Sequence, residues 1–227
     1  MSWYGITLIS EGPTDVGGLA DPSAEWADTQ DGFLQNVFRR CLPHHDLQYF
    51  NGRTVVLGLA ENTSLLGALE AKAKRAGALA AYYNRSHVVI YVVDADNDAD
   101  PTEHRLAPIV RGLRAGIAAV SGVEPIPIAA IAHKAIEAWV LADEAAVKEA
   151  AGARLTGRAP RQPESLWGVP HDPMSNHPKQ VLRRLFGGRL SRRDYSAVGA
   201  LVDPVTLAQR CPIGFAPLLD QIAAACP

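Results

Sequence analysis

Four short runs of apolar residues, rich in valine and isoleucine, constrain the fold of this chain more than any other feature. They occupy residues 4–10, 54–59, 87–93 and 125–131. Their apolar residues are consecutive rather than alternating, which is typical of strands buried on both faces between layers of helices. Longer stretches with helical periodicity separate them, at about 24–41, 63–84 and 104–121. This order predicts an α/β fold with a mostly parallel, four-stranded sheet flanked by helices.

The pattern changes in the last hundred residues. Residues 133–151 predict one helix, and the Gly-, Pro- and Arg-rich residues 152–178 predict a loop or lid. Short helices are expected over 178–187 and 194–226. The C-terminal part is therefore predicted to be a basic loop followed by a helical extension.

Two units follow from this change, although one compact unit is equally compatible with the sequence. We expect an α/β core over residues 1–145 and a basic loop with helices, packed on that core, over 146–227. Within the second part, Asp203 and Pro204 predict the N-cap and first residue of a helix.

Composition limits the class of protein. The 227 residues are 48% hydrophobic and 20% charged, which is enough apolar chain for a self-sufficient core. No run approaches the roughly 18 apolar residues of a membrane span, and the first residues lack the basic start of a signal peptide, so we expect a cytoplasmic protein without membrane attachment. The three cysteines include no CxxC pair, which argues against a disulfide framework or a zinc ribbon.

An acidic cluster follows the third apolar run. The strand predicted from Val88 onward ends in four acids, at Asp94, Asp96, Asp98 and Asp100. Clustered carboxylates at the end of a buried strand repel one another unless a cation neutralises them, and such oxygen ligands suit magnesium, manganese or calcium. In open parallel sheets, ligands bind at the carboxyl ends of strands. The plainer alternative is an acidic surface turn.

A second pair of acids follows the first apolar run. Glu11 ends the strand, Gly12 permits a tight turn, and Pro13 suits the first position of a helix that carries Asp15. Asp15 alone would be an ordinary acid of a first helical turn. Together with the acids after the third run, however, this pair predicts a site for one or two divalent cations that face a phosphate.

These motifs resemble those of a known family. EGPTD at 11–15 and DAD at 94–96, each after a strand, are similar to the Toprim domain of topoisomerases, primases and old-family (overcoming-lysogenisation-defect) nucleases. The whole chain looks more closely like the small stand-alone Toprim-like proteins of bacterial defence regions. Segments 132–143 (AHKAIEAWVLAD), 177–182 (HPKQVL) and 211–215 (CPIGF) carry that closer resemblance. It implies a Rossmann-like Toprim fold and phosphodiester cleavage or transfer.

The resemblance assigns roles to individual acids. Glu11 corresponds to the Toprim glutamate, Asp15 to the second acid of the nuclease-type motif, and Asp94 and Asp96 to the DxD pair. Glu137 corresponds to the acid of the EAW segment in the closer family. Its alternative interpretation is a helix-surface glutamate close to a lysine three residues earlier.

The implied cofactor is Mg²⁺ or Mn²⁺. The residues implied to hold a first metal are Glu11, Asp94 and Asp96. Those implied to add a second are Asp15, Asp98 and Glu137. Lys134 is the candidate for offsetting charge on the leaving group or the scissile phosphate, and a structural role for it is as plausible.

Charge is distributed unevenly along the chain. Residues 1–150 carry 12 Lys+Arg and 19 Asp+Glu, whereas residues 151–200 carry nine bases and three acids. A basic flank of this kind predicts contact with a nucleic-acid backbone or an acidic partner protein. The candidate contact residues are Lys179, Arg183, Arg184, Arg192 and Arg193. Aromatic residues make up only 7% of the chain and do not interleave with these bases along the sequence, unlike in single-strand stacking platforms.

Three functions therefore compete. The first is a metal-dependent Toprim-type nuclease, an effector of antiphage defence that works with an ABC- or SMC-type ATPase, as the resemblance implies. The second is a catalytically inactive adaptor or sensor that binds a partner protein or nucleic acid. The third is a DxD-containing, metal-dependent nucleotide-sugar transferase, which would leave Glu11 and Asp15 unexplained.

Overall fold

The computed structural model of the chain describes residues 5–10, 13–16, 31–51, 65–84, 87–95, 102–120, 122 and 124–226. Its strands are β1 (Gly5–Ser10), β2 (Asp46–Asn51), β3 (Val88–Asp94) and β4 (Ile126–Ala132). The helices that lie between these strands are α1 (Pro13–Val16), α2 (Phe33–Cys41), α4 (Leu65–Asn84) and α5 (Thr102–Ala118). The helices that follow β4 are α6 (Ile136–Val140), α7 (Glu144–Ala151), α8 (Pro178–Leu185), α9 (Arg192–Leu201), α10 (Pro204–Arg210) and α11 (Phe215–Ala225).

The described strands form one parallel sheet in the order β2-β1-β3-β4. From β1 the chain first moves outward to β2, then crosses back to β3 and continues outward to β4. The direction of winding therefore reverses between β1 and β3, which are neighbours in the sheet. Such a switch point opens a crevice at the carboxyl ends of its two strands, and ligands of α/β proteins commonly bind there.

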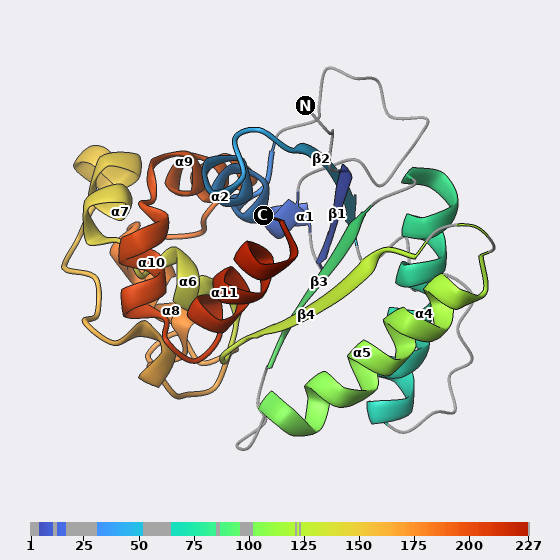
Figure 1. Cartoon of the computed structure of the whole chain (residues 1–227). Coiled ribbons are helices and arrows are strands. Elements are labelled where there is room, and N and C mark those ends of the chain that lie inside the picture. The colour runs from blue at the N-terminus through green and yellow to red at the C-terminus, as the bar shows by residue number, and fades with distance from the viewer. Residues whose placement is uncertain are drawn as a thin grey trace.

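Helices cover both faces of the sheet (Figure 1). α4 and α5 lie on one face, where Ala73, Ile109 and Leu113 pack on Val89 and Tyr91 of β3. α2 and α11 lie on the other face. Residues of β1 and β3 alternate between these two layers, which explains why the strands are apolar at consecutive positions.

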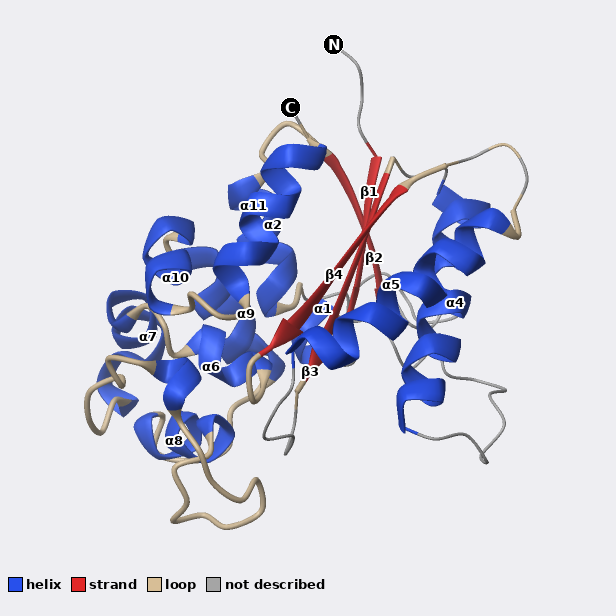
Figure 2. Ribbon diagram, turned by 60° about the horizontal axis from the view of Figure 1, so that its bottom comes forward, coloured by secondary structure: helices blue, strands red, loops and turns tan. Residues whose placement is uncertain are grey.

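The C-terminal helices form a second layer outside α2 and α11 (Figures 1 and 2). Trp139 of α6 is fully buried among them and meets Phe215 of α11 edge to face, with ring centroids 5.3 Å apart. The same hydrophobic cluster extends from Ile6 of β1 to Ile222 of α11. The helices after β4 are therefore continuous with the core of the sheet.

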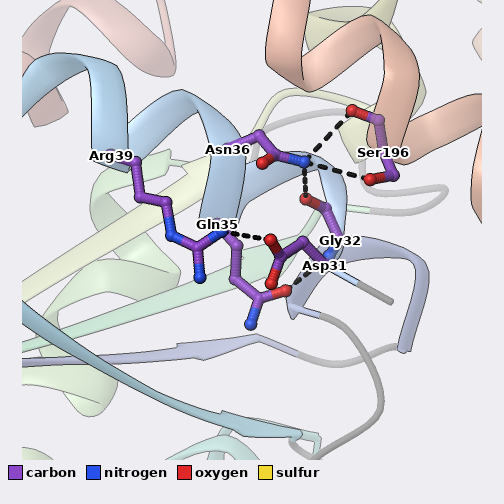
Figure 3. Close-up of polar contacts among 6 residues, drawn as sticks. All are labelled: Asp31, Gly32, Gln35, Asn36, Arg39 and Ser196. Carbon is purple, nitrogen blue, oxygen red and sulfur yellow. Dashed lines mark hydrogen bonds and ion pairs between the residues drawn. The ribbon is translucent and has the colours of Figure 1, made fainter. Parts of the chain in front are cut away.

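Polar contacts also join α2 to α9 (Figure 3). The Asn36 side-chain amide of α2 donates to the backbone oxygen and to the hydroxyl of Ser196, both at 3.1 Å. Gln35 accepts from the backbone N–H of Gly32 at the start of α2, and Arg39 pairs with Asp31. A Cβ atom at Gly32 would lie 2.3 Å from the backbone oxygen of Asp15, so the start of α2 packs directly on α1.

The predicted α/β class with a parallel sheet flanked by helices is confirmed. Strands β1, β3 and β4 match three predicted runs to within about one residue at each end. The predicted strand at 54–59 lies outside the described residues. Strand β2 was not expected from the sequence, because DLQYFN mixes polar and apolar residues and lacks the Val/Ile enrichment of the other strands.

The single helix predicted over residues 133–151 is wrong, since the chain forms α6 and α7 there instead. The first helix ends at Val140, and Asp143 begins the second as its N-cap, because its carboxylate accepts from the N–H groups of Ala145 and Ala146. The predicted cap at Asp203 is confirmed, with Pro204 as the first residue of α10. Within the described residues, no helix is both long and apolar enough to cross a membrane.

Candidate functional site

The carboxyl end of β1 carries a buried polar pair. Ser10 is the last residue of β1, and its hydroxyl donates to the Asp15 carboxylate of α1 over 2.9 Å. Both side chains are almost fully buried. Asp15 is therefore not the solvated first-turn acid of the plainer interpretation, and its carboxylate lies at the switch point of the sheet.

The carboxyl end of β3 places Asp94 at the start of α6. One carboxylate oxygen of Asp94 accepts from the Ile136 N–H over 2.9 Å. The N-cap residue of α6, Ala135, makes no side-chain cap of its own, so Asp94 satisfies the first turn of that helix from a neighbouring strand. Arg105 of α5 donates to the backbone oxygen of Asp94 over 3.5 Å.

Glu137 and Tyr195 form a second buried pair. The Tyr195 hydroxyl of α9 donates to the Glu137 carboxylate of α6 over 2.9 Å. Burial raises the pKa of Tyr195, and the negative charges of Glu137 and Asp15 raise it further, while Arg183 lowers it. The hydroxyl therefore lies within electrostatic reach of two acids and one arginine that come from three different helices.

These contacts overturn the interpretation of Glu137 as a helix-surface glutamate, because the side chain is 6% exposed. Tyr195 is a residue that the sequence analysis missed. It lies in an ordinary helical stretch, SRRDYSAV, where nothing indicates that its hydroxyl meets a carboxylate 58 residues away.

Lys134 follows β4 in a left-handed backbone conformation, with φ of 71°. A non-glycine residue in this region costs about 1–3 kcal/mol and persists only where its surroundings hold it. The side chain is 6% exposed, and its ammonium group lies 3.5 Å from the centre of the Trp167 ring. The cation is thus held in one place at the carboxyl end of the sheet.

Three arginines line an open hollow of about 470 Å³ at the end of α8. Its lining residues are Pro173, Gln180, Arg183, Arg184, Gly187, Gly188 and Arg189. Two of the five predicted contact residues, Arg183 and Arg184, line it, together with Arg189, which the sequence analysis did not single out. The other three, Lys179, Arg192 and Arg193, lie outside the hollow, and Lys179 and Arg193 are exposed.

The described donors agree in kind with the cofactor implied by the resemblance, since Asp15 and Asp94 offer carboxylate oxygens at the ends of adjacent parallel strands. Glu11, Asp96 and Asp98, the other predicted ligands beside Glu137, lie outside the described residues. In the part of the chain that the structure does describe, no three His, Cys, Asp or Glu side chains are grouped so that they could hold a metal ion. A metal site would therefore need the described acids, Asp15 and Asp94, together with predicted ligands that lie outside the described residues.

A further buried carboxylate, Glu164, lies beside this region. Its oxygens accept from the indole N–H of Trp139 and from the backbone N–H groups of Ile213 and Gly214. Burial raises the pKa of Glu164, although these three donors oppose the change. Glu164 therefore ties the turn before α11 to α6.

Comparison with models of protein families, with curated proteins and with solved structures gives no significant match to this chain. Functional interpretation therefore depends on the geometry of the site.

Proposed function

We propose that the protein is a divalent-metal-dependent phosphodiesterase of Toprim type, acting as a nuclease. The observation that carries this proposal is the position of Asp15 and Asp94, which follow or end two adjacent parallel strands at the switch point of the sheet. By the motif resemblance, the proposed role is that of an effector in antiphage defence, with an ABC- or SMC-type ATPase as partner.

The charges around these acids support a phosphate substrate. Arg183 lines the hollow at the end of α8, and its charge lowers the pKa of Tyr195, so this arginine is within electrostatic reach of the hydroxyl that donates to Glu137. In this proposal the positive charge of the hollow attracts an anionic substrate toward the carboxylates that would bind the metal. Mg²⁺ or Mn²⁺, when bound, lowers the pKa of a coordinated water and offsets charge on the phosphate.

The protein groups have separate roles in this proposal. Asp15 and Asp94, with Glu11, Asp96 and Asp98, are the metal-binding acids. Lys134 is poised to offset negative charge on the leaving oxygen, because its strained backbone and the Trp167 ring hold the ammonium group in place. Tyr195 orients Glu137 through its hydrogen bond, which keeps that carboxylate from rotating.

Cleavage of plasmid, single-stranded DNA and transfer RNA by the purified protein in Mn²⁺ tests the proposal, beside Asp94→Asn and Lys134→Ala. We expect wild-type cleavage that chelation of the metal abolishes. Asp94→Asn should lose at least about 100-fold in rate, because removal of one charge-stabilising group commonly costs this much. Arg114→Glu, an exposed substitution on α5, is the control and should cleave as wild type does.

Metal binding has its own measurement. Titration of Mg²⁺ or Mn²⁺ should raise the melting temperature of the wild type, and the shift should shrink in Asp94→Asn. An equal shift in both proteins would show that the metal binds elsewhere. Cleavage that persists in Asp94→Asn would refute the proposed catalytic site.

A binding module without catalysis is the second candidate. It is favoured by the structural partners of the acids, since Asp94 caps α6 and Glu137 accepts from Tyr195. Such a module would bind nucleic acid or retain an ATPase in a pull-down without any metal-dependent cleavage. The cleavage and pull-down assays together distinguish the two functions.

A further inference from the structure

A loop before α8 exposes large apolar side chains. Trp167, Val169 and Met174 are 53%, 58% and 80% exposed. These are among the largest exposures of bulky apolar residues in the described part of the chain, and all three lie within eight residues of one another. Such a local concentration is uncommon unless the surface binds something.

Hydrogen bonds fix this loop to α8. Gln180 donates to the backbone oxygen of Pro170, and Arg184 donates to those of Pro173 and Ser175, the latter two over 2.6 and 2.8 Å. The Ser175 hydroxyl closes the loop by donating to the Val169 oxygen over 2.7 Å. The apolar side chains are therefore presented by an ordered segment.

Trp167 is linked to the arginine hollow through contacts of the loop. Its neighbour Gly168 packs so tightly that a Cβ atom there would come within 2.7 Å of the Ser175 hydroxyl and the His177 N–H nitrogen. Ser175 is in turn held by Arg184, which lines the hollow. The indole and the arginines are thus connected through one hydrogen-bonded loop, and together they make up the candidate binding surface.

The charge of the residues that line the hollow favours binding of an anion. α8 ends in a Schellman motif, in which the N–H groups of Gly187 and Gly188 donate to the oxygens of Arg184 and Arg183, with Gly187 at φ of 67°. Three arginines line the hollow beside this turn, of which Arg189 is exposed and Arg183 and Arg184 are half-buried, and none of the residues that line the hollow is acidic. The hollow can therefore neutralise phosphate groups without an internal counter-ion.

We propose that this surface binds single-stranded nucleic acid, with a base stacked on Trp167 and backbone phosphates in the arginine hollow. Lys134 covers one face of the indole, so the base would stack on the other. This inference rests on the proposed function and names its substrate class. Exposed base faces are available in single strands, whereas in a duplex they are stacked within the helix.

The fold creates this platform from residues that are separated in sequence. Trp167 lies 33 positions after Lys134 and 16 before Arg183. For that reason the lack of interleaved aromatic and basic residues along the chain does not argue against a stacking platform.

Fluorescence anisotropy of a labelled 12-nucleotide oligothymidylate, measured in a chelator so that no cleavage occurs, tests the platform. Trp167→Ala should weaken binding about tenfold or more, as expected for loss of one stacked base, and Trp167→Phe should restore most of it. Arg183→Glu and Arg189→Glu should each weaken binding and reduce the salt dependence by about 0.7 in log K against log salt. Tyr82→Ala and Arg114→Glu, exposed substitutions on α4 and α5, are the matched controls.

The outcomes separate this inference from the proposed function. Wild-type affinity in Trp167→Ala, or binding of a 12-base-pair duplex that is tighter than that of the single strand, would overturn the platform even if the protein cleaves nucleic acid. Equal weakening by the control variants would also overturn it. Trp167-dependent binding without cleavage in Mn²⁺ would support the platform and refute the nuclease.

Discussion

At the scale of single residues, Glu164 shows how a buried carboxylate can organise its surroundings. Its carboxylate oxygens accept three hydrogen bonds, from the Trp139 indole nitrogen at 3.2 Å and from the backbone nitrogens of Ile213 and Gly214 at 2.8 and 2.9 Å. Its backbone oxygen lies 2.7 Å from the Nδ1 atom of His133, the residue before Lys134. Glu164 therefore connects the packing of α6 and α11 to the segment that carries the candidate catalytic lysine.

The raised pKa of Glu164 predicts a pH dependence of stability. Below its ordinary value of 4.5 the group is protonated in both the folded and the unfolded state. As the pH rises above that value, the unfolded state ionises first, so the contribution of this group to folding falls until the pH passes the raised folded-state pKa.

We therefore expect the difference in unfolding free energy between wild type and Glu164→Gln to decrease as the pH rises from 4.5. Urea unfolding of both proteins at acidic and neutral pH measures it, with Glu149→Gln at an exposed position of α7 as the control. A difference that grows with pH would contradict the raised pKa.

At the scale of elements, the contact between α4 and α5 depends on glycine. A Cβ atom at Gly116 would lie 1.8 Å from the backbone oxygen of Lys74, and one at Gly112 would lie 2.2 Å from that of Glu70. At Gly77 of α4 the same atom would lie 2.4 Å from the Leu113 oxygen. Three glycines therefore let the two helix backbones approach one another closely over the sheet.

Gly116→Ala should destabilise the protein by about 1–3 kcal/mol, because the added methyl group forces the helices apart. Helix propensity alone predicts the opposite sign, a gain of roughly 0.5–1 kcal/mol. Urea unfolding measures the sign directly, and Ala115→Gly at the exposed neighbouring position calibrates the propensity effect. A stabilised Gly116→Ala protein would show that the helices are less closely packed.

At the scale of the whole molecule, one hydrophobic cluster connects the sheet to the C-terminal helices. It includes Leu8 of β1, Phe38 of α2, Trp139 of α6, Val198 of α9 and Leu218 of α11. The contacts of Asn36 with Ser196 join the same two regions through polar groups. The chain is therefore expected to unfold cooperatively.

Urea unfolding followed by far-ultraviolet circular dichroism and by tryptophan fluorescence should give the same midpoint. A Trp167→Phe background reduces the signal of the exposed indole, so that buried Trp139 contributes a larger share. Two separate midpoints would show that residues 1–145 and 146–227 unfold as independent units.

The sequence by itself determined the α/β class and the ends of three strands, because consecutive apolar residues report burial on both faces wherever the strand lies. It also placed Asp94 at the carboxyl end of β3. These features depend on neighbours in the chain, and local periodicity is enough to detect them.

Only the tertiary structure decided which distant groups meet. The strand β2 is recognisable by its pairing with β1, and the break between α6 and α7 is stabilised in part by the bond from Asp203 N–H to Asp143. The packing of the C-terminal helices and loops brings the Tyr195 hydroxyl to the Glu137 carboxylate. It also brings the Trp167 ring to the Lys134 ammonium group. Such contacts depend on packing between elements, which no spacing along the sequence encodes, and they define the candidate site.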